Sequence, residues 1–171
     1  LAGGSSSDDF GARERDAGAA LETVYHPFLR RLRNLKMPFV TAVNGPAAGV
    51  GMSFAMMGDM ILAAKSAYFL QAFRRIGLVP DVGGTWLLSR GPGRLGRHLA
   101  LTGASVGAAD AIAAGLADLC IGSAQLPALR EALSAGGDVR ATAEAMSEAL
   151  EGPALLDRAW IDECYGRPSA G

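Results

Sequence analysis

The sequence lacks several features that would point to particular classes of protein. Its 171 residues include two cysteines and two histidines, and the formal net charge is only −1. Cys120 and Cys164 are too few for a disulfide framework and lack metal-site spacing, so we expect free thiols and no metal. His26 and His98 neighbour no candidate nucleophile, and we interpret both as surface or packing residues. A charge balance this close to neutral argues against electrostatic binding of nucleic acid.

Long apolar runs are also missing. No stretch approaches the roughly 18 consecutive apolar residues of a membrane span, and no basic leader with an apolar segment precedes a cleavage site. We therefore expect a soluble, cytoplasmic protein with no membrane partner. Because the chain starts at Leu1 inside a run of glycine, serine and aspartate, we also expect an N-terminal portion to be missing.

The spacing of apolar residues predicts an α/β domain. Apolar residues recur at helical spacing over 21–35, which predicts a helix, and Pro38 ends it. The segment 39–43, FVTAV, is typical of a short strand. A glycine-broken turn then leads to an apolar helix over 52–59 and a returning strand over 60–64. This order predicts a β-turn-α-β unit with a buried helix.

Capping residues predict helices in the C-terminal part of the chain. Ser105 and Ser123 stand where helix N-caps are expected, and Gly136 suits a C-cap. Pro153 suits the first turn of a last helix. No repeat and no long linker divides the chain, so we expect one α/β domain with a helical C-terminal part.

The glycine-broken turn carries a first chemical clue. Gly49, Val50 and Gly51 open a helix directly after a strand, and the N–H groups of a first helical turn have no partner within the helix. Such donors attract negatively charged oxygen. The same glycines would also let a buried helix pack close to its strand, and this stretch alone favours packing.

A literal GxGxxG motif occurs at Gly91, Gly93 and Gly96. A proline inside it removes a backbone donor that a phosphate cradle would use. No acidic residue ends a following strand at the distance that a dinucleotide site requires. We therefore favour close packing at the start of a helix.

One carboxylate, Asp81, stands between a proline and a diglycine inside the otherwise apolar stretch 76–88, IGLVPDVGGTWLL. Apolar neighbours would partly desolvate it and make it a usable proton acceptor near neutral pH. The alternative is that Asp81 caps a helix that starts near Gly83. The residues alone leave both interpretations open.

Several stretches together resemble one known family. Residues 37–69, MPFVTAVNGPAAGVGMSFAMMGDMILAAKSAYF, and 77–90, GLVPDVGGTWLLSR, look like the central signature of the crotonase (enoyl-CoA hydratase/isomerase) superfamily. Residues 93–118, GRLGRHLALTGASVGAADAIAAGLAD, keep the family pattern. The segment RAWIDECYG, 158–166, is similar to the C-terminal region of the 3-hydroxyisobutyryl-CoA hydrolases. The resemblance covers roughly residues 20–165.

The resemblance implies an α/β fold, a crotonase-like ββα spiral with a helical C-terminal region. We accordingly expect a single domain over 1–171, with the spiral core over 1–121 and helices over 122–171. Members of the family assemble as trimers or paired trimers, so a homotrimer or hexamer is expected. The implied partner is an acyl-CoA substrate, and no cofactor beyond the coenzyme A of that substrate is implied.

The resemblance also implies a catalytic apparatus. Two backbone N–H groups of the family form an oxyanion hole, which lets the thioester oxygen carry enolate charge. One donor maps onto Val50, with Gly49 and Gly51 beside the substrate, and the other maps onto Gly4 in an AGxD-like motif. A donor of this kind typically lowers a barrier by about 3–4 kcal/mol.

Departures from the family pattern favour one activity over the others. Ser53 and Phe73 stand where hydratases carry two glutamates, so the acid/base pair that adds water is absent. Asp81 matches the single carboxylate of the enoyl-CoA isomerases, including the ring-epoxide type. We therefore predict that Asp81 shuttles a proton within an enoyl-CoA while Phe73 lines the acyl pocket. A 3-hydroxyisobutyryl-CoA-type hydrolase and a non-catalytic acyl-CoA-binding protein remain the alternatives.

Overall fold

The computed structural model describes residues 18–150 and 158–168, and the chain divides into two compact units, Leu1–Met37 and Pro38–Gly171. In the first unit a short π-helix, η1 (Leu21–Tyr25), continues into α2 (His26–Arg33). The helix expected over 21–35 is thus confirmed. The expectation of a single domain over the whole chain stays a prediction.

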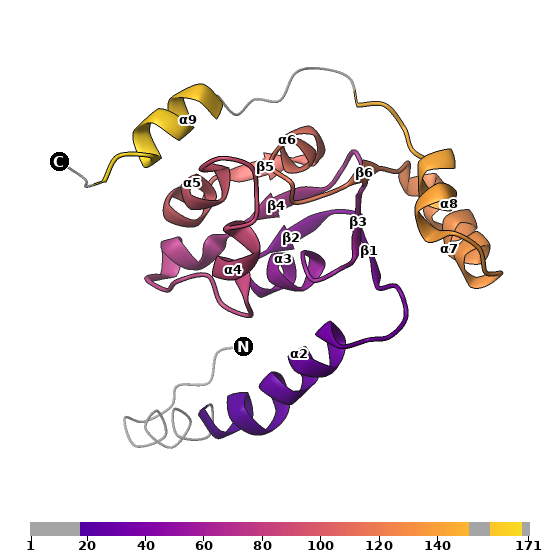
Figure 1. Cartoon of the computed structure of the whole chain (residues 1–171), viewed down its shortest axis with the longest axis horizontal. Helices are drawn as coiled ribbons and strands as arrows, with labels where there is room; N and C mark the ends of the chain where they lie inside the picture. Colours follow the sequence, from indigo (N-terminus) through magenta and orange to yellow (C-terminus); the bar gives the residue numbers. More distant parts are fainter. Residues whose placement is uncertain (1–17, 151–157, 169–171) are drawn as a thin grey trace, which may run out of the picture. The chain divides into compact units, whose positions relative to one another are not determined.

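The strands in the described part of the second unit form two small sheets, and successive turns of the chain add one strand to each (Figure 1). The first sheet is parallel, in the order β1 (Val40–Val43), β3 (Met60–Ala63) and β6 (Leu119–Cys120). In the second sheet β4 pairs parallel with β2 and antiparallel with β5; its strands are β2 (Pro46–Ala48), β4 (Tyr68–Leu70) and β5 (Ser105–Gly107).

The first two pairs of consecutive strands are each followed by helical segments, which gives a ββα repeat. After β2 comes α3 (Val50–Ala55), and after β4 come the 3₁₀ helix η2 (Ala72–Ile76) and α4 (Gly84–Leu88). Further helices among the residues that the structure describes are α5 (Leu95–Thr102), α6 (Ala108–Ala113), η3 (Ser123–Gln125), α7 (Leu126–Ser134), α8 (Val139–Ala145) and α9 (Arg158–Tyr165). The α/β class and the helical C-terminal part are both confirmed.

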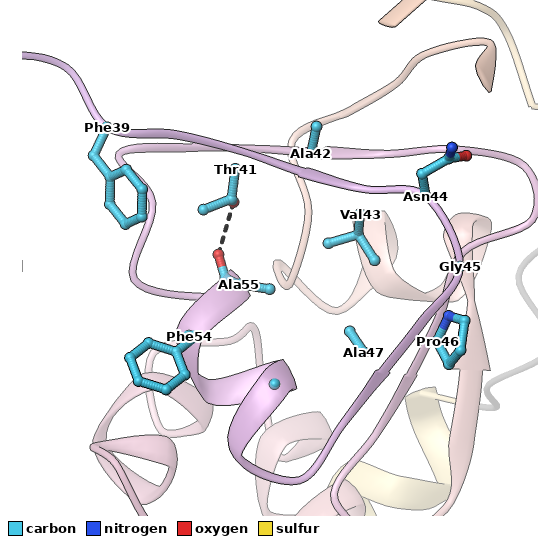
Figure 2. Close-up of a pocket in the computed structure, with 11 residues that line it drawn as sticks. Phe39, Thr41, Ala42, Val43, Asn44, Gly45, Pro46, Ala47, Phe54 and Ala55 are labelled. Carbon is cyan, nitrogen blue, oxygen red and sulfur yellow. Dashed lines mark hydrogen bonds between the residues drawn. The ribbon is translucent and has the colours of Figure 1, made fainter. Parts of the chain in front are cut away.

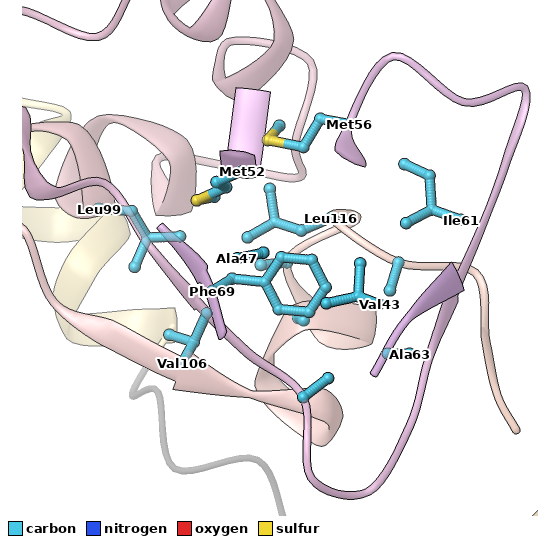
Figure 3. Packing of buried hydrophobic residues seen from close by; sticks show 14 of the residues in the cluster. Val43, Ala47, Met52, Met56, Ile61, Ala63, Phe69, Leu99, Val106 and Leu116 are labelled. Carbon is cyan, nitrogen blue, oxygen red and sulfur yellow. The ribbon is translucent and has the colours of Figure 1, made fainter. Parts of the chain in front are cut away.

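Helix α3 is fixed against the strands by one polar contact and by packing. The hydroxyl of Thr41 in β1 donates to the carbonyl of Ala55 at the end of α3, at 2.8 Å (Figure 2). On the other side, Met52 is buried in a core centred on the ring of Phe69, which lies among side chains such as Val43 and Leu116 (Figure 3). The Thr41 bond therefore fixes the end of α3, whereas the packing of Met52 holds its first turn.

Local capping rules placed some C-terminal elements wrongly. Ser105 pairs with β4 as part of β5, and Gly107 is the N-cap of α6. Ser123 begins η3, and its hydroxyl donates to the Asn44 side chain at 2.6 Å. Gly136, with φ of 90°, directly follows the C-cap of α7, close to the expected position. Pro153 lies outside the described residues.

The glycines of the GxGxxG motif serve packing in the described structure. Helix α5 begins at Leu95, inside the motif, and a Cβ on Gly96 would overlap the carbonyl oxygen of Leu88 in α4. The two helices approach closely because position 96 has no side chain. The packing interpretation of this motif is therefore confirmed.

Helix α9 packs on α5 through a histidine. The Nδ1 atom of His98 lies 3.3 Å from the Tyr165 hydroxyl, and its ring meets Trp160 edge-on with centroids 6.3 Å apart. Asp162 accepts a hydrogen bond from the backbone N–H of Arg94 at 2.6 Å. The packing interpretation of His98 is confirmed, and burial lowers the pKa of its imidazole.

We predict that acid weakens the fold through His98. Because its pKa is lowered in the folded chain, the unfolded chain binds the proton first, so stability falls as pH drops below about 6.5. Thermal melts from pH 7.5 to 5 should show this fall, and His98→Asn should reduce it. The matched control is His26→Asn in the other unit, which should keep the parental dependence. An unchanged dependence in His98→Asn would contradict the assignment.

Candidate functional site

The turn into α3 presents backbone N–H groups that the helix does not use. Gly49, with φ of 54°, donates its N–H to the carbonyl of Leu70 at 2.8 Å. The first bond within the helix runs from the N–H of Ser53 to the carbonyl of Gly49, at 3.1 Å. The N–H groups of Val50 and Gly51 precede it, where a helix offers no acceptor. They are available to a negatively charged oxygen.

Phe73 lies beside this turn. Phe73 belongs to η2 and its side chain is buried. A Cβ built on Gly49 would lie 3.9 Å from the Phe73 ring atom Cε2. The close approach places an apolar ring next to the free N–H groups of the helix start. The structure thus brings together the predicted site residues Gly49, Val50, Gly51 and Phe73.

The carboxylate of Asp81 is exposed, and the expected desolvation is not observed. The reason is that its apolar neighbours in sequence also face outward, with Val79 76% and Trp86 46% exposed. The capping interpretation is wrong as well. Gly83 is the N-cap of α4, and in the described part of the chain no side chain caps that helix. The Asp81 carboxylate accepts instead from the N–H of Val82.

A buried serine ties the Asp81 loop to α3. Ser53 is fully buried, and its Oγ donates to the backbone carbonyl of Asp81 at 2.9 Å. One helix therefore presents the free N–H of Val50 at its start and supports the Asp81 peptide one turn later. From the sequence, Ser53 was interpreted only as a position where the catalytic glutamate of the hydratases is absent. A hydroxyl in an otherwise apolar helix was the available signal, because buried polar groups are nearly always bonded.

Gln71 is a second buried polar residue that sequence reasoning missed. It is 1% exposed, and neither atom of its side-chain amide has a hydrogen-bond partner among the described residues. The Gln71 Nε2 and the Ser53 Oγ lie on the same side of Gly84. A Cβ built on Gly84 would be 3.4 Å from the Gln71 Nε2 and 2.9 Å from the Ser53 Oγ. Polar atoms thus gather beneath the Asp81 loop.

A separate open cleft of about 500 Å³ lies between β1, β2 and the side of α3 (Figure 2). Gly51 and Phe54 contribute to its lining from α3, together with residues of the two strands. Of the predicted site residues, it contains Gly51 but not Val50, Phe73 or Asp81. The cleft and the Asp81 loop are therefore distinct features of the described structure.

The remaining predictions concern metals, thiols and the second oxyanion donor. Residues 18–150 and 158–168 contain no cluster of histidine, cysteine or carboxylate side chains suited to a metal ion. None of their helices combines the length and hydropathy that a membrane crossing requires. Cys120 and Cys164 are free, and burial, with a smaller contribution from Glu148, raises the pKa of the Cys120 thiol. Gly4 lies outside the described residues.

Comparison with known proteins gives a consistent assignment. The enoyl-CoA hydratase/isomerase family model matches residues 10–170. The 1,2-epoxyphenylacetyl-CoA isomerase of Escherichia coli (strain K12) is 48% identical over 97 residues, 56% of this chain and 37% of that protein. The mitochondrial 3-hydroxyisobutyryl-CoA hydrolase of Xenopus tropicalis is 34% identical over 127 residues, 70% of this chain and 33% of that protein.

The fold agrees with the sequence matches. The crystal structure of a carnitinyl-CoA dehydratase from Mycobacterium thermoresistibile superposes with a TM-score of 0.72 at 33% identity, over 83% of this chain and 42% of that one. The expected crotonase-like fold is confirmed. The chain spans only 33–42% of the length of these three relatives. By its sequence and its fold, the chain belongs to the enoyl-CoA hydratase/isomerase family.

Proposed function

We propose that the chain belongs to an enzyme that moves a double bond within an enoyl-CoA, with Asp81 as the proton shuttle. The observation that carries the proposal is the bond from Ser53 to the Asp81 carbonyl, because it ties a carboxylate loop to the helix that presents the Val50 N–H. By the family resemblance, Ser53 and Phe73 stand where hydratases carry glutamates, which leaves Asp81 as the matching acid. The 48% sequence identity over 97 residues to a 1,2-epoxyphenylacetyl-CoA isomerase also supports an isomerase over a hydratase.

The proposed reaction needs one base and no water. Asp81 removes a proton from the carbon between the thioester carbonyl and the double bond. The electron pair moves onto the thioester oxygen, which accepts a hydrogen bond from the Val50 N–H and a second from Gly4. Asp81, now protonated, returns the proton to the far carbon of the dienolate, and the double bond becomes conjugated with the carbonyl.

The surroundings of Asp81 suit an apolar acyl chain. In the same stretch of chain Val79 and Trp86 are exposed and offer apolar surface that a bound chain would cover. Phe73, close to Gly49, would exclude the water that a hydratase has to admit. An acyl chain bound in this way would also desolvate the Asp81 carboxylate and make it a better base.

A thioester hydrolase is the second candidate, and the similarity to the 3-hydroxyisobutyryl-CoA hydrolase favours it. That activity would release free CoA, whereas isomerisation of 3-hexenoyl-CoA would raise the ultraviolet absorbance of the conjugated thioester without releasing CoA. A non-catalytic acyl-CoA-binding protein would do neither. Assembly as a homotrimer or hexamer and a cytoplasmic location stay predictions.

We predict that acetoacetyl-CoA stabilises the protein. A ligand at 100 times its Kd adds about 2.7 kcal/mol to the free energy of unfolding. In a chain of this size that raises Tm by roughly 5–10 °C. Differential scanning fluorimetry would measure the shift, with free CoA as the control that lacks the enolisable thioester. A Tm shift with NAD and none with acetoacetyl-CoA would contradict the proposal.

A further inference from the structure

The hydroxyl of Ser53 holds the peptide that carries Asp81. Its Oγ donates to the Asp81 carbonyl oxygen at 2.9 Å, and the N–H of Gly84 donates to the same oxygen at 2.8 Å. A carbonyl oxygen has two lone pairs, and these two donors occupy both. The Asp81 peptide is therefore held from α3 on one side and from α4 on the other.

The next residue adopts a conformation that β-branched side chains rarely accept. Val82 has φ of 54°, and among the described residues it is the one non-glycine residue with a positive φ. Such a conformation is strained and persists only where its surroundings over-determine it. The N–H of Val82 donates to the Asp81 carboxylate. The direction of that carboxylate thus depends on how the Asp81 peptide is held.

Ser53 and Gly84 also fit closely against one another. A Cβ on Gly84 would lie 2.9 Å from the Ser53 Oγ and 3.2 Å from the Cβ of Pro80. Gly84 is the first residue of α4, where the backbone accommodates residues other than glycine. The hydroxyl of Ser53 is thus the nearest obstacle to a side chain at position 84.

We infer that Ser53 is a positioning residue for the Asp81 base. Its hydroxyl fixes the Asp81 peptide, and through it the strained Val82 turn, in the orientation from which the carboxylate reaches the substrate. The inference rests on the proposed function, because it takes Asp81 as the proton acceptor. It also gives a role to a position where the family's hydratases carry a glutamate: the serine acts through the loop and does not touch the substrate.

Removal of the hydroxyl tests the inference first. Ser53→Ala should lower kcat for 3-hexenoyl-CoA by about 10–100-fold, since a small misplacement of a reacting group has effects of this size. KM and the Tm shift with acetoacetyl-CoA should stay near parental values. The matched control, Thr41→Val, removes a similar hydroxyl bond to α3 from outside the site, and its kcat should stay within about two-fold of the parent.

A double-mutant cycle separates positioning from a purely structural role. Gly84→Ala alone should lower Tm by several degrees, because its Cβ meets the Ser53 hydroxyl. In the double variant Ser53→Ala/Gly84→Ala the nearest obstacle is gone while the Cβ of Pro80 remains, so Tm should recover in part and kcat should stay low. If Ser53 were only structural, kcat would recover to the same extent as Tm.

Amide hydrogen exchange gives a readout that does not depend on activity. Exchange of the Gly84 N–H, which bonds the Asp81 carbonyl, should become about ten-fold faster in Ser53→Ala and stay unchanged in Thr41→Val. If the parent isomerises 3-hexenoyl-CoA and Ser53→Ala keeps both the parental kcat and the parental exchange rate, the inference is overturned. The proposed function then still stands. A parent that does not isomerise 3-hexenoyl-CoA overturns the proposed function, and with it the role of Ser53 toward a base.

Discussion

Asp81→Asn is expected to lower the turnover of 3-hexenoyl-CoA by about 10²–10⁴-fold, the usual contribution of a positioned general base. The amide keeps the shape of the side chain but cannot take the proton. Binding of acetoacetyl-CoA and Tm should change little, because the carboxylate is exposed and caps no helix in the described structure. Initial rates from the absorbance of the conjugated product would measure the loss.

The control for this substitution is Asp138→Asn. Asp138 is also exposed and caps α8 by accepting the N–H of Ala141 at 2.7 Å, and asparagine caps about as well as aspartate. Both turnover and Tm should therefore match the parent. Parental turnover in Asp81→Asn would remove Asp81 from the mechanism and favour a non-catalytic acyl-CoA-binding protein.

Elements with strong local signals could be predicted from the sequence. Residues 39–43 and 60–64 are short apolar runs bounded by turns, and they form β1 and β3. The turn NGPAAGVG was expected to be without a strand, yet it contains β2, whose partner β4 lies about twenty residues away. Ser105 was misplaced for the same reason. Its pairing with Leu70 is not visible in its local sequence.

The site shows the same limit at the level of side chains. Neighbours in sequence suggested that Asp81 would be desolvated, but Val79 and Trp86 turn outward, because tertiary structure decides which face a loop exposes. The bond from Ser53 to Asp81 joins residues 28 positions apart, and no periodicity encodes it. The position of Val50 at a helix start, by contrast, followed from the glycine turn, since every helix leaves its first N–H groups unbonded.

Val50→Pro is expected to lower kcat by about 10²–10³-fold, the loss that follows removal of one oxyanion donor. Proline lacks the N–H group, and at the first position of a helix its ring and fixed φ are tolerated. Val50 is the first residue of α3, and its side chain is 38% exposed, so the substitution removes little packing. The N–H that disappears precedes the first bond within the helix, from Ser53 to Gly49, so no helical bond is lost.

The matched control is Val50→Ala, which trims the same side chain but keeps the donor. Its kcat should stay close to the parental value, whereas Val50→Pro should lose kcat with a similar Tm. If both variants lost activity equally, the side chain would be responsible and the backbone donor would not. If Val50→Pro turned over 3-hexenoyl-CoA at the parental rate, the thioester oxygen would have to be stabilised elsewhere, and the turn at Gly49 would serve only to pack α3 against its strand.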